Sequence, residues 1–179
     1  TDATDPKVAS AWWARLGNWY STRLDRPDYG MPSLRRALEL DPTNRIAYTA
    51  LAETQRKQNK WADLADTLRA HAAVETETSV KVDLLLGLGD LNESQLSATA
   101  KAIEAYQAAA DLDDSSDDAL AALERLYRRD ERWVNLAKVL DRRAEICEEG
   151  GDPGRAAAIR RELGTMRAEK LGDQEGAIA

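Results

Sequence analysis

The chain is poor in the side chains on which most catalytic and metal sites depend. Its 179 residues include one cysteine, one histidine and no phenylalanine. A single cysteine, Cys147, excludes an intrachain disulfide and any metal site with several cysteine ligands. A Cys–His catalytic pair would require Cys147 to meet His71, and nothing in the sequence indicates that they do. We therefore expect a protein that is not an enzyme and that carries no cofactor and no metal.

Long apolar runs and excess positive charge are also lacking. No segment approaches the roughly 18 apolar residues that span a bilayer, and no signal segment opens the chain. The formal net charge is -7, whereas binding to nucleic acid depends on clustered Lys and Arg. We expect neither a membrane nor a nucleic-acid partner, and a cytoplasmic location is our default expectation. Because the chain begins at Thr1 rather than at a methionine, we interpret it as a fragment of a larger protein.

The residues that are abundant favour helices. The hydrophobic fraction is 43%, and Ala and Leu dominate it, accompanied by Arg, Glu and Asp. Local signals mark boundaries, since Pro42 cannot continue a preceding helix and the acidic pair Asp117 and Asp118 suits a helix start. We expect helices over residues 8–24, 29–40, 44–59, 61–75, 80–97, 100–112, 116–130, 133–148 and 154–171, with another beginning near 174.

The chain repeats itself at an offset of 72 residues. Leu16-Gly17 recurs as Leu88-Gly89, and Trp61 recurs as Trp133. The same offset relates Leu40-Asp41 to Leu112-Asp113, Ala47 to Ala119 and Leu51 to Leu123. Each 72-residue block contains four helical runs, so the elementary unit is about 36 residues long and consists of two helices.

The residues of the first unit resemble the pattern of the tetratricopeptide repeat (TPR) family. Trp13, Leu16, Gly17 and Tyr20 match its first helix, and the second helix and its turn are matched by Gly30, Leu34, Ala37 and Pro42. The resemblance, to arrays of bacterial type, implies an all-α fold, a right-handed superhelical solenoid of antiparallel helix pairs that forms a single domain over residues 1–179. Its units would span about 8–42, 44–78, 80–114, 116–150 and 154–179, the last being incomplete.

The spacing in the first helix also predicts how it packs. Trp13, Leu16 and Tyr20 fall on one helical face. We expect this face to be the buried one, with Trp13 as a buried aromatic anchor. Gly17 costs roughly 1 kcal/mol relative to alanine inside a helix, so another helix should approach it closely.

The acidic run Asp111–Asp118 raises the question of a calcium-binding loop. A calcium-binding loop that began at Asp111 would need glycine and glutamate where Ser116 and Ala122 stand. We interpret the run as a turn followed by the capped, acidic start of a helix.

We expect the side chains of one histidine and two tryptophans to have structural roles. His71 has no carboxylate or cysteine at a convincing spacing, so we expect it to fill a gap between helices. Trp61 and Trp133 begin second helices at equivalent places, which favours a role as structural anchors over a binding cage.

The resemblance implies a concave groove lined by the first helix of each unit. By that resemblance the groove residues are Asn18, Ser21, Thr49, Glu53, Arg56, Asp83, Leu86, Asp90, Glu93, Arg125, Arg128 and Arg161. The groove would be acidic in its middle and basic near its C-terminal end, and reversal of Arg125 and Arg128 should leave the fold intact. The implied function is a non-catalytic scaffold that holds a peptide or helix of a protein partner. The alternative is a structural spacer or self-assembly segment within a longer array.

We expect the second helix of the last unit to be cut after its first turn. Residues 174–179, QEGAIA, align with the start of the helix that contains Ile103, with Ile178 in the place of Ile103. Since each unit of a solenoid is covered by its neighbour, we expect Leu163, Met166 and Leu171 to be partly uncovered. We therefore expect weak self-association through this C-terminal end.

Overall fold

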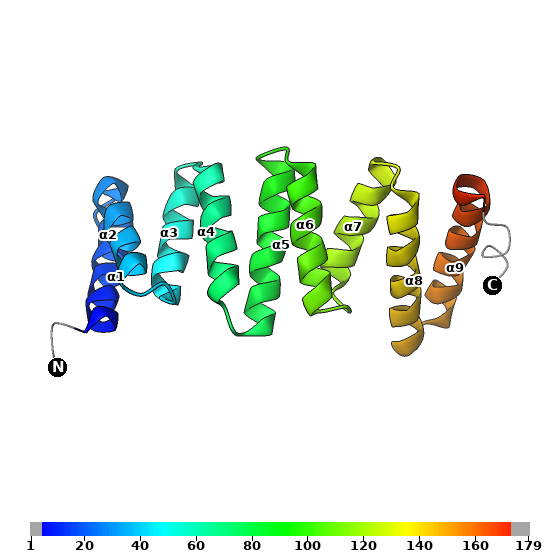
Figure 1. Cartoon of the computed structure of the whole chain (residues 1–179), viewed down its shortest axis with the longest axis horizontal. Coiled ribbons are helices and arrows are strands. Elements are labelled where there is room, and N and C mark those ends of the chain that lie inside the picture. Colours follow the sequence, from blue (N-terminus) through cyan, green and yellow to red (C-terminus); the bar gives the residue numbers. More distant parts are fainter. Residues whose placement is uncertain (1–4, 173–179) are drawn as a thin grey trace. The chain divides into compact units, whose positions relative to one another are not determined.

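The computed structural model describes residues 5–172, and within that range the chain consists of helices joined by short turns (Figure 1). The chain divides between residues 98 and 99 into two compact units. Unit 1 contains α1 (Pro6–Thr22), α2 (Pro27–Leu40), α3 (Arg45–Lys57), α4 (Trp61–Val74) and α5 (Thr78–Ser94). Unit 2 contains α6 (Thr99–Leu112), α7 (Asp117–Arg129), α8 (Trp133–Glu149), α9 (Pro153–Met166) and the π-helix η1 (Arg167–Leu171).

The helices agree with those expected from the sequence to within a few residues at each end, and α9 continues into η1 rather than ending as an α-helix. The boundary between the two units falls between α5 and α6, inside the expected unit 80–114. The helix expected near residue 174 lies outside the described residues. No helix between residues 5 and 172 is long and apolar enough to cross a membrane.

The 72-residue repeat extends to the polar caps and to the turns. The side chain of Asn44 accepts a hydrogen bond from the backbone N–H of Ala47 at the start of α3, and Ser116 accepts one from Ala119 at the start of α7. Four turn residues adopt a left-handed backbone with φ near 50°, and they form two pairs at the same offset: Asp25 with Ser97, and Asn59 with Glu131.

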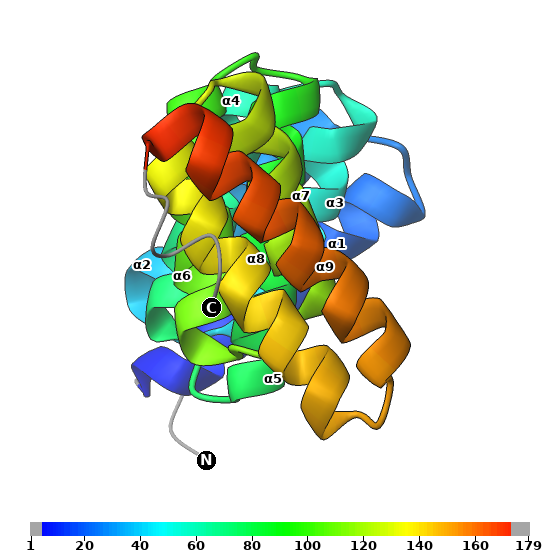
Figure 2. The same ribbon diagram turned by 90° about the vertical axis from the view of Figure 1, so that its right-hand side faces the viewer.

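Neighbouring helices pack against each other within each unit. In unit 1, α1 packs on α2 and α3, α3 on α4, and α4 on α5. In unit 2, α6 packs on α7, α7 on α8, and α8 on α9. Figure 2 shows α8 and α9 side by side with opposite chain directions, and η1 contacts both of them. The contacts of α1 with α2, α3 with α4, and α7 with α8 join the two helices of one expected unit, whereas α8 and α9 belong to successive units.

The closest approach in unit 1 is between α1 and α2. A Cβ atom built on Gly17 would lie 2.6 Å from the Cγ of Leu34 and 2.8 Å from the carbonyl oxygen of Gly30. One built on Gly30 would lie 2.0 Å from the Oγ of Ser21. Both distances to side chains are shorter than van der Waals contact, so only glycine fits at these two positions. The predicted close approach at Gly17 is confirmed.

The buried face of α1 is not the one that the sequence predicted. Its buried residues are the small ones, Ser10, Ala14, Gly17 and Ser21. Trp13 and Leu16 are exposed and Tyr20 is half-buried. The prediction of Trp13 as a buried anchor is therefore wrong, because close contact with α2 requires small side chains and turns the large ones outward.

The C-terminal end is also better covered than predicted. Leu163 and Met166 of α9 are buried, and only Leu171 in η1 is exposed. The expectation that Leu163 and Met166 are uncovered is wrong. The predicted self-association through this end was based on their exposure, so it loses its support.

Replacing Gly17 with alanine tests the close approach of α1 and α2. We expect Gly17→Ala to lower the free energy of unfolding by about 1–3 kcal/mol, because the methyl group overpacks the interface. Gly87→Ala is the matched control, since nothing lies within 4 Å of a Cβ at that helical position. It should raise stability by up to about 1 kcal/mol through helix propensity. Urea unfolding of both variants measures this, and equal stabilities would contradict the interpretation.

Candidate functional site

A hollow of about 310 Å³ lies on unit 1, between α1 and α3. Three of the residues that line it, Asn18, Thr49 and Glu53, were expected to line a groove. The rest of the lining consists of Arg45, Ile46 and Ala50. The structure therefore brings residues from the first helices of two successive pairs to one place.

The hollow combines an apolar surface with two opposite charges. Ile46 is 61% exposed, so it contributes an apolar side chain to the wall of the hollow. Arg45, Thr49 and Glu53 follow one another at intervals of four residues, so they share one face of α3. A separation of eight residues places Arg45 and Glu53 about 12 Å apart along the helix axis. The apolar patch of Ile46 thus lies beside a row that ends in a cation and an anion.

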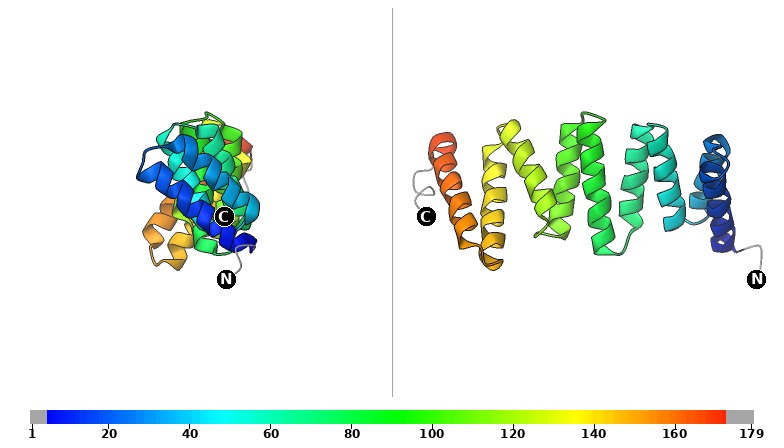
Figure 3. Two further views of the ribbon diagram at one scale, coloured as in Figure 1. Left: turned by 90° about the vertical axis from the view of Figure 1, so that its left-hand side faces the viewer. Right: turned by 180° about the vertical axis from the view of Figure 1, so that it is seen from behind.

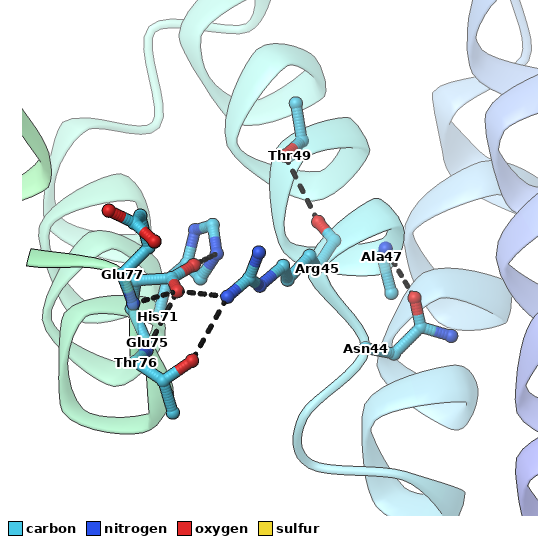
Figure 4. A network of polar contacts seen from close by, with 8 residues as sticks. All are labelled: Asn44, Arg45, Ala47, Thr49, His71, Glu75, Thr76 and Glu77. Atoms are coloured by element: carbon cyan, nitrogen blue, oxygen red, sulfur yellow. Dashed lines mark hydrogen bonds and ion pairs between the residues drawn. The ribbon is translucent and has the colours of Figure 1, made fainter. Parts of the chain in front are cut away.

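Hydrogen bonds to two residues at the end of α4 fix the position of the Arg45 guanidinium. Its Nη2 donates to the carboxylate of Glu75 and to the Oγ1 of Thr76, the latter at 3.2 Å (Figure 4). The Oγ1 of Thr49 donates to the backbone carbonyl of Arg45 at 3.0 Å. Arg45 is therefore positioned for recognition before any partner binds.

Glu75 connects three helices through one buried carboxylate. Its side chain is fully buried, and its Oε1 accepts hydrogen bonds from the backbone N–H groups of Thr76 at 2.7 Å and Glu77 at 2.8 Å. These backbone hydrogen bonds, with the nearby charge of Arg45, hold the pKa of Glu75 below its ordinary value. The charged carboxylate thus links the start of α3, the end of α4 and the residue that precedes α5.

His71 packs beside this carboxylate. Its ring is buried and stacks on Tyr48 with the ring centroids 4.9 Å apart. Its Nε2 lies 3.7 Å from the Oε2 of Glu75. Burial lowers the pKa of His71 below its ordinary value, against the opposing effect of Glu75. His71 fills a gap between helices as expected, but the view that it has no carboxylate at a convincing spacing was wrong, since Glu75 stands four residues later.

Not every expected groove residue reaches the hollow. Ser21 is buried against Gly30, so its side chain faces α2 and is not available to a ligand. The remaining expected residues of unit 1, Arg56, Asp83, Leu86, Asp90 and Glu93, do not line this hollow. Conversely, the sequence-based selection missed Arg45, Ile46 and Ala50. The sequence did contain a feature that identifies Arg45, because this residue lies one helical turn before Thr49 and shares its face.

In unit 2, Arg128 lies at a second hollow, of about 410 Å³, together with Trp133 and Met166. Its Nη2 pairs with Glu124 at 2.9 Å and with Glu162 at 2.6 Å, which joins α7 to α9. Reversal of Arg128 to Glu would place three carboxylates together, so the prediction that this change leaves the fold intact stays untested. The other two expected cations, Arg125 and Arg161, are exposed.

The acidic run between α6 and α7 forms the turn that the sequence predicted. Asp113 accepts hydrogen bonds from the N–H and Oγ of Ser115, and Asp114 pairs with Arg142 at 2.9 Å. Within residues 5–172, no group of three or more His, Cys, Asp or Glu side chains is placed to hold a metal ion.

The two tryptophans at equivalent places behave alike. Trp61 and Trp133 are the first residues of α4 and α8, and both are half-buried. Their place at the start of a second helix is confirmed, and their role as structural anchors stays a prediction. Trp133 also carries the ammonium of Lys170 over its ring, 5.3 Å from the centroid.

Part of the chain matches a known family model, and its fold is similar to that of solved structures. Residues 119–167 match the family model for the tetratricopeptide repeat. Two crystal structures of MamA are similar. One has a TM-score of 0.55 and 22% identity over 82% of each chain, and the other a TM-score of 0.54 and 19% identity over 95% of this chain and 86% of that chain. Identities this low show a shared fold only. No curated protein matches the chain.

We expect acid to destabilise unit 1 in two steps. The unfolded chain binds a proton at His71 near the ordinary pKa of 6.5, while the folded chain resists it, so stability falls as the pH drops below 6.5. Glu75, whose folded pKa is lowered from 4.5, adds a loss as the pH falls below 4.5 towards its folded pKa. Urea midpoints measured across this range should lose the first step in His71→Gln and keep the second. An unchanged pH profile in this variant would contradict the assignment.

Proposed function

We propose that this chain is a protein-interaction scaffold whose partner inserts a peptide or helix into the hollow between α1 and α3. The match of residues 119–167 to the tetratricopeptide repeat supports a scaffold role. The single observation that carries the proposal is the convergence of Asn18, Thr49 and Glu53 on one hollow. All three occupy places that, by resemblance to the repeat family, line a concave groove. An exposed Ile46 beside them supplies the apolar contact area that a recognition site needs.

The charges of the hollow define the partner's chemistry. Arg45 pairs best with a carboxylate and Glu53 with a Lys or Arg side chain. An extended peptide advances about 3.3 Å per residue, so about four residues span the 12 Å between these two charges. The fitting segment therefore carries an acidic and a basic side chain about four residues apart, with an apolar side chain between them for Ile46.

The lining side chains suit recognition better than proton transfer. The side chains of Asn18 and Thr49 do not titrate. Contact with the buried Glu75 fixes Arg45 in advance, which reduces the entropy lost on binding. The proposed role is therefore non-catalytic.

Selection of displayed peptides against the chain tests this proposal. We expect enriched peptides to contain an acidic and a basic residue about four positions apart, flanking an apolar residue. They should lose binding to a variant that combines Ile46→Gln with Glu53→Lys. Both side chains are exposed, so the free energy of unfolding should change by no more than about 0.5 kcal/mol per substitution.

Arg56→Gln is the matched control, because Arg56 is exposed on the same helix but lies outside the hollow. Binding that survives the double substitution would show that the peptide binds outside the hollow. A selection that enriches no peptide would instead favour a structural spacer without ligand capture.

A further inference from the structure

Two further hollows occupy equivalent places in the repeat, one in each unit. The α2–α4 hollow of unit 1, about 330 Å³, is lined by residues of α2, α3 and α4. The α6–α8 hollow of unit 2, about 360 Å³, is lined by residues of α6, α7 and α8. Every residue that lines the first has its counterpart, 72 positions later, in the lining of the second. The repeat therefore builds the same hollow twice.

The floor of the α6–α8 hollow is apolar. Figure 1 and the right panel of Figure 3, seen from opposite sides, both show α7 between α6 and α8. Leu120, Leu123 and Tyr127 of α7 line the hollow together with Val139 of α8, and all four side chains are buried. An apolar side chain placed on this floor would extend a core that is already packed.

In the α2–α4 hollow the charges are neutralised within the chain. Arg35 of α2 and Asp63 of α4 both line it, and they form an ion pair at 3.6 Å that joins its two walls. Asp66 pairs with Arg69, one helical turn further along, at 2.7 Å. The α2–α4 hollow is therefore bridged from wall to wall and leaves little for a ligand to bind.

The bridge is missing from the α6–α8 hollow. Gln107 and Asn135 stand where Arg35 and Asp63 stand in unit 1. Neutral amides form no ion pair, but each can donate hydrogen bonds to a peptide group and accept them from it. The two walls thus offer backbone-binding groups where unit 1 has a closed contact.

The cation on the α8 wall lacks the partner that its counterpart has. Lys138 stands where Asp66 does, and Asp141 stands where Arg69 does. Asp141 is paired with Arg167 of η1 at 2.6 Å instead. Among the residues that the structure describes, Lys138 forms no ion pair and no hydrogen bond.

The anion on the α6 wall is in the same position. Asp111 stands where Glu39 does, and Glu39 pairs with Arg36 at 2.7 Å. The counterpart of Arg36 is Ala108, which carries no charge. The carboxylate of Asp111 likewise forms no ion pair and no hydrogen bond within residues 5–172.

The third charged side chain of the lining, Arg142, is already engaged. It pairs with Asp114 at 2.9 Å and with Glu145 at 3.0 Å. Glu104 and Arg132 are exposed and do not line the hollow. The charges left for a ligand are therefore one cation on the α8 wall and one anion on the α6 wall.

We infer that the α6–α8 hollow binds an extended peptide segment of another protein in which an apolar side chain stands between an acidic and a basic one. The acidic side chain pairs with Lys138 and the basic one with Asp111. The apolar side chain lies on the floor, and Gln107 and Asn135 bind the peptide backbone. A volume of about 360 Å³ lies near the lower end of the range for ligand pockets, roughly 300–1,000 Å³, which suits a few residues. The site uses none of the residues of the proposed function, so the inference does not depend on it.

Peptide selection on a chain whose α1–α3 hollow is disabled isolates this site. A phage-displayed library of linear heptapeptides is selected against the full chain carrying Ile46→Gln and Glu53→Lys. The hollow between α1 and α3 then does not account for binding. We expect the enriched peptides to contain an apolar residue between an acidic and a basic one.

The ion pair of unit 1 supplies the variant that closes the site. Gln107→Arg/Asn135→Asp introduces, at equivalent positions, the pair that Arg35 and Asp63 form, so circular dichroism should show the variant folded. A fluorescein-labelled copy of the most enriched peptide should bind this variant at least about tenfold more weakly, as measured by fluorescence anisotropy.

A second variant tests the charge and does not rely on the closing pair. Lys138 is exposed, so Lys138→Glu should leave the fold intact and weaken binding of the same peptide. A peptide in which lysine replaces the acidic residue should recover binding to this variant. Glu104→Gln is the matched control, because Glu104 is exposed on α6 outside the hollow, and binding should not change.

Equal binding to the parent chain, the closing variant and Lys138→Glu would overturn the inference, and so would a selection that enriches no peptide. Neither outcome bears on the hollow between α1 and α3, which is disabled in the selected chain. A dimer of the full chain, detected by sedimentation and abolished by the closing variant, would make a second copy the occupant and refute the choice of a partner peptide.

Discussion

The close approach of α1 to α2 at Gly17 and Gly30 is the constraint on which unit 1 depends. Backbone atoms come so near that a side chain fits at neither position. This contact selects a stripe of small residues as the buried face of α1, and it fixes the rotation of the helix about its own axis. Two consequences follow. Asn18 is turned towards α3, where it joins the hollow, and the side chains of Trp12, Trp13 and Trp19 are exposed.

A buried carboxylate sets the electrostatics of the hollow. Glu75 is removed from water, a costly state unless the charge is paired and hydrogen-bonded. Two backbone N–H groups and the guanidinium of Arg45 bond to its Oε1, while its Oε2 lies 3.7 Å from the Nε2 of His71 and accepts no hydrogen bond. Because Glu75 holds Arg45 while also fixing the passage from α4 to α5, the same interaction supports the fold and presents a cation to a partner. Removing Glu75 would therefore disturb binding and stability together.

The hollow is small and mixed, with an exposed isoleucine beside a row that ends in opposite charges. A surface of this kind suits a short segment that is recognised by the spacing of its charges.

The sequence by itself determined the helices, their pairing and the 72-residue repeat, because these depend on local capping, on turn residues and on short-range apolar spacing. It also determined that Gly17 is approached closely and that Thr49 and Glu53 share a face. Only the tertiary structure decided which face of α1 is buried, because Trp13-Leu16-Tyr20 and Ser10-Ala14-Gly17 are both regular helical stripes. The choice between them rests on how near α2 can come. The link from Arg45 to Glu75, across 30 residues, likewise arose only when three helices met around one buried carboxylate.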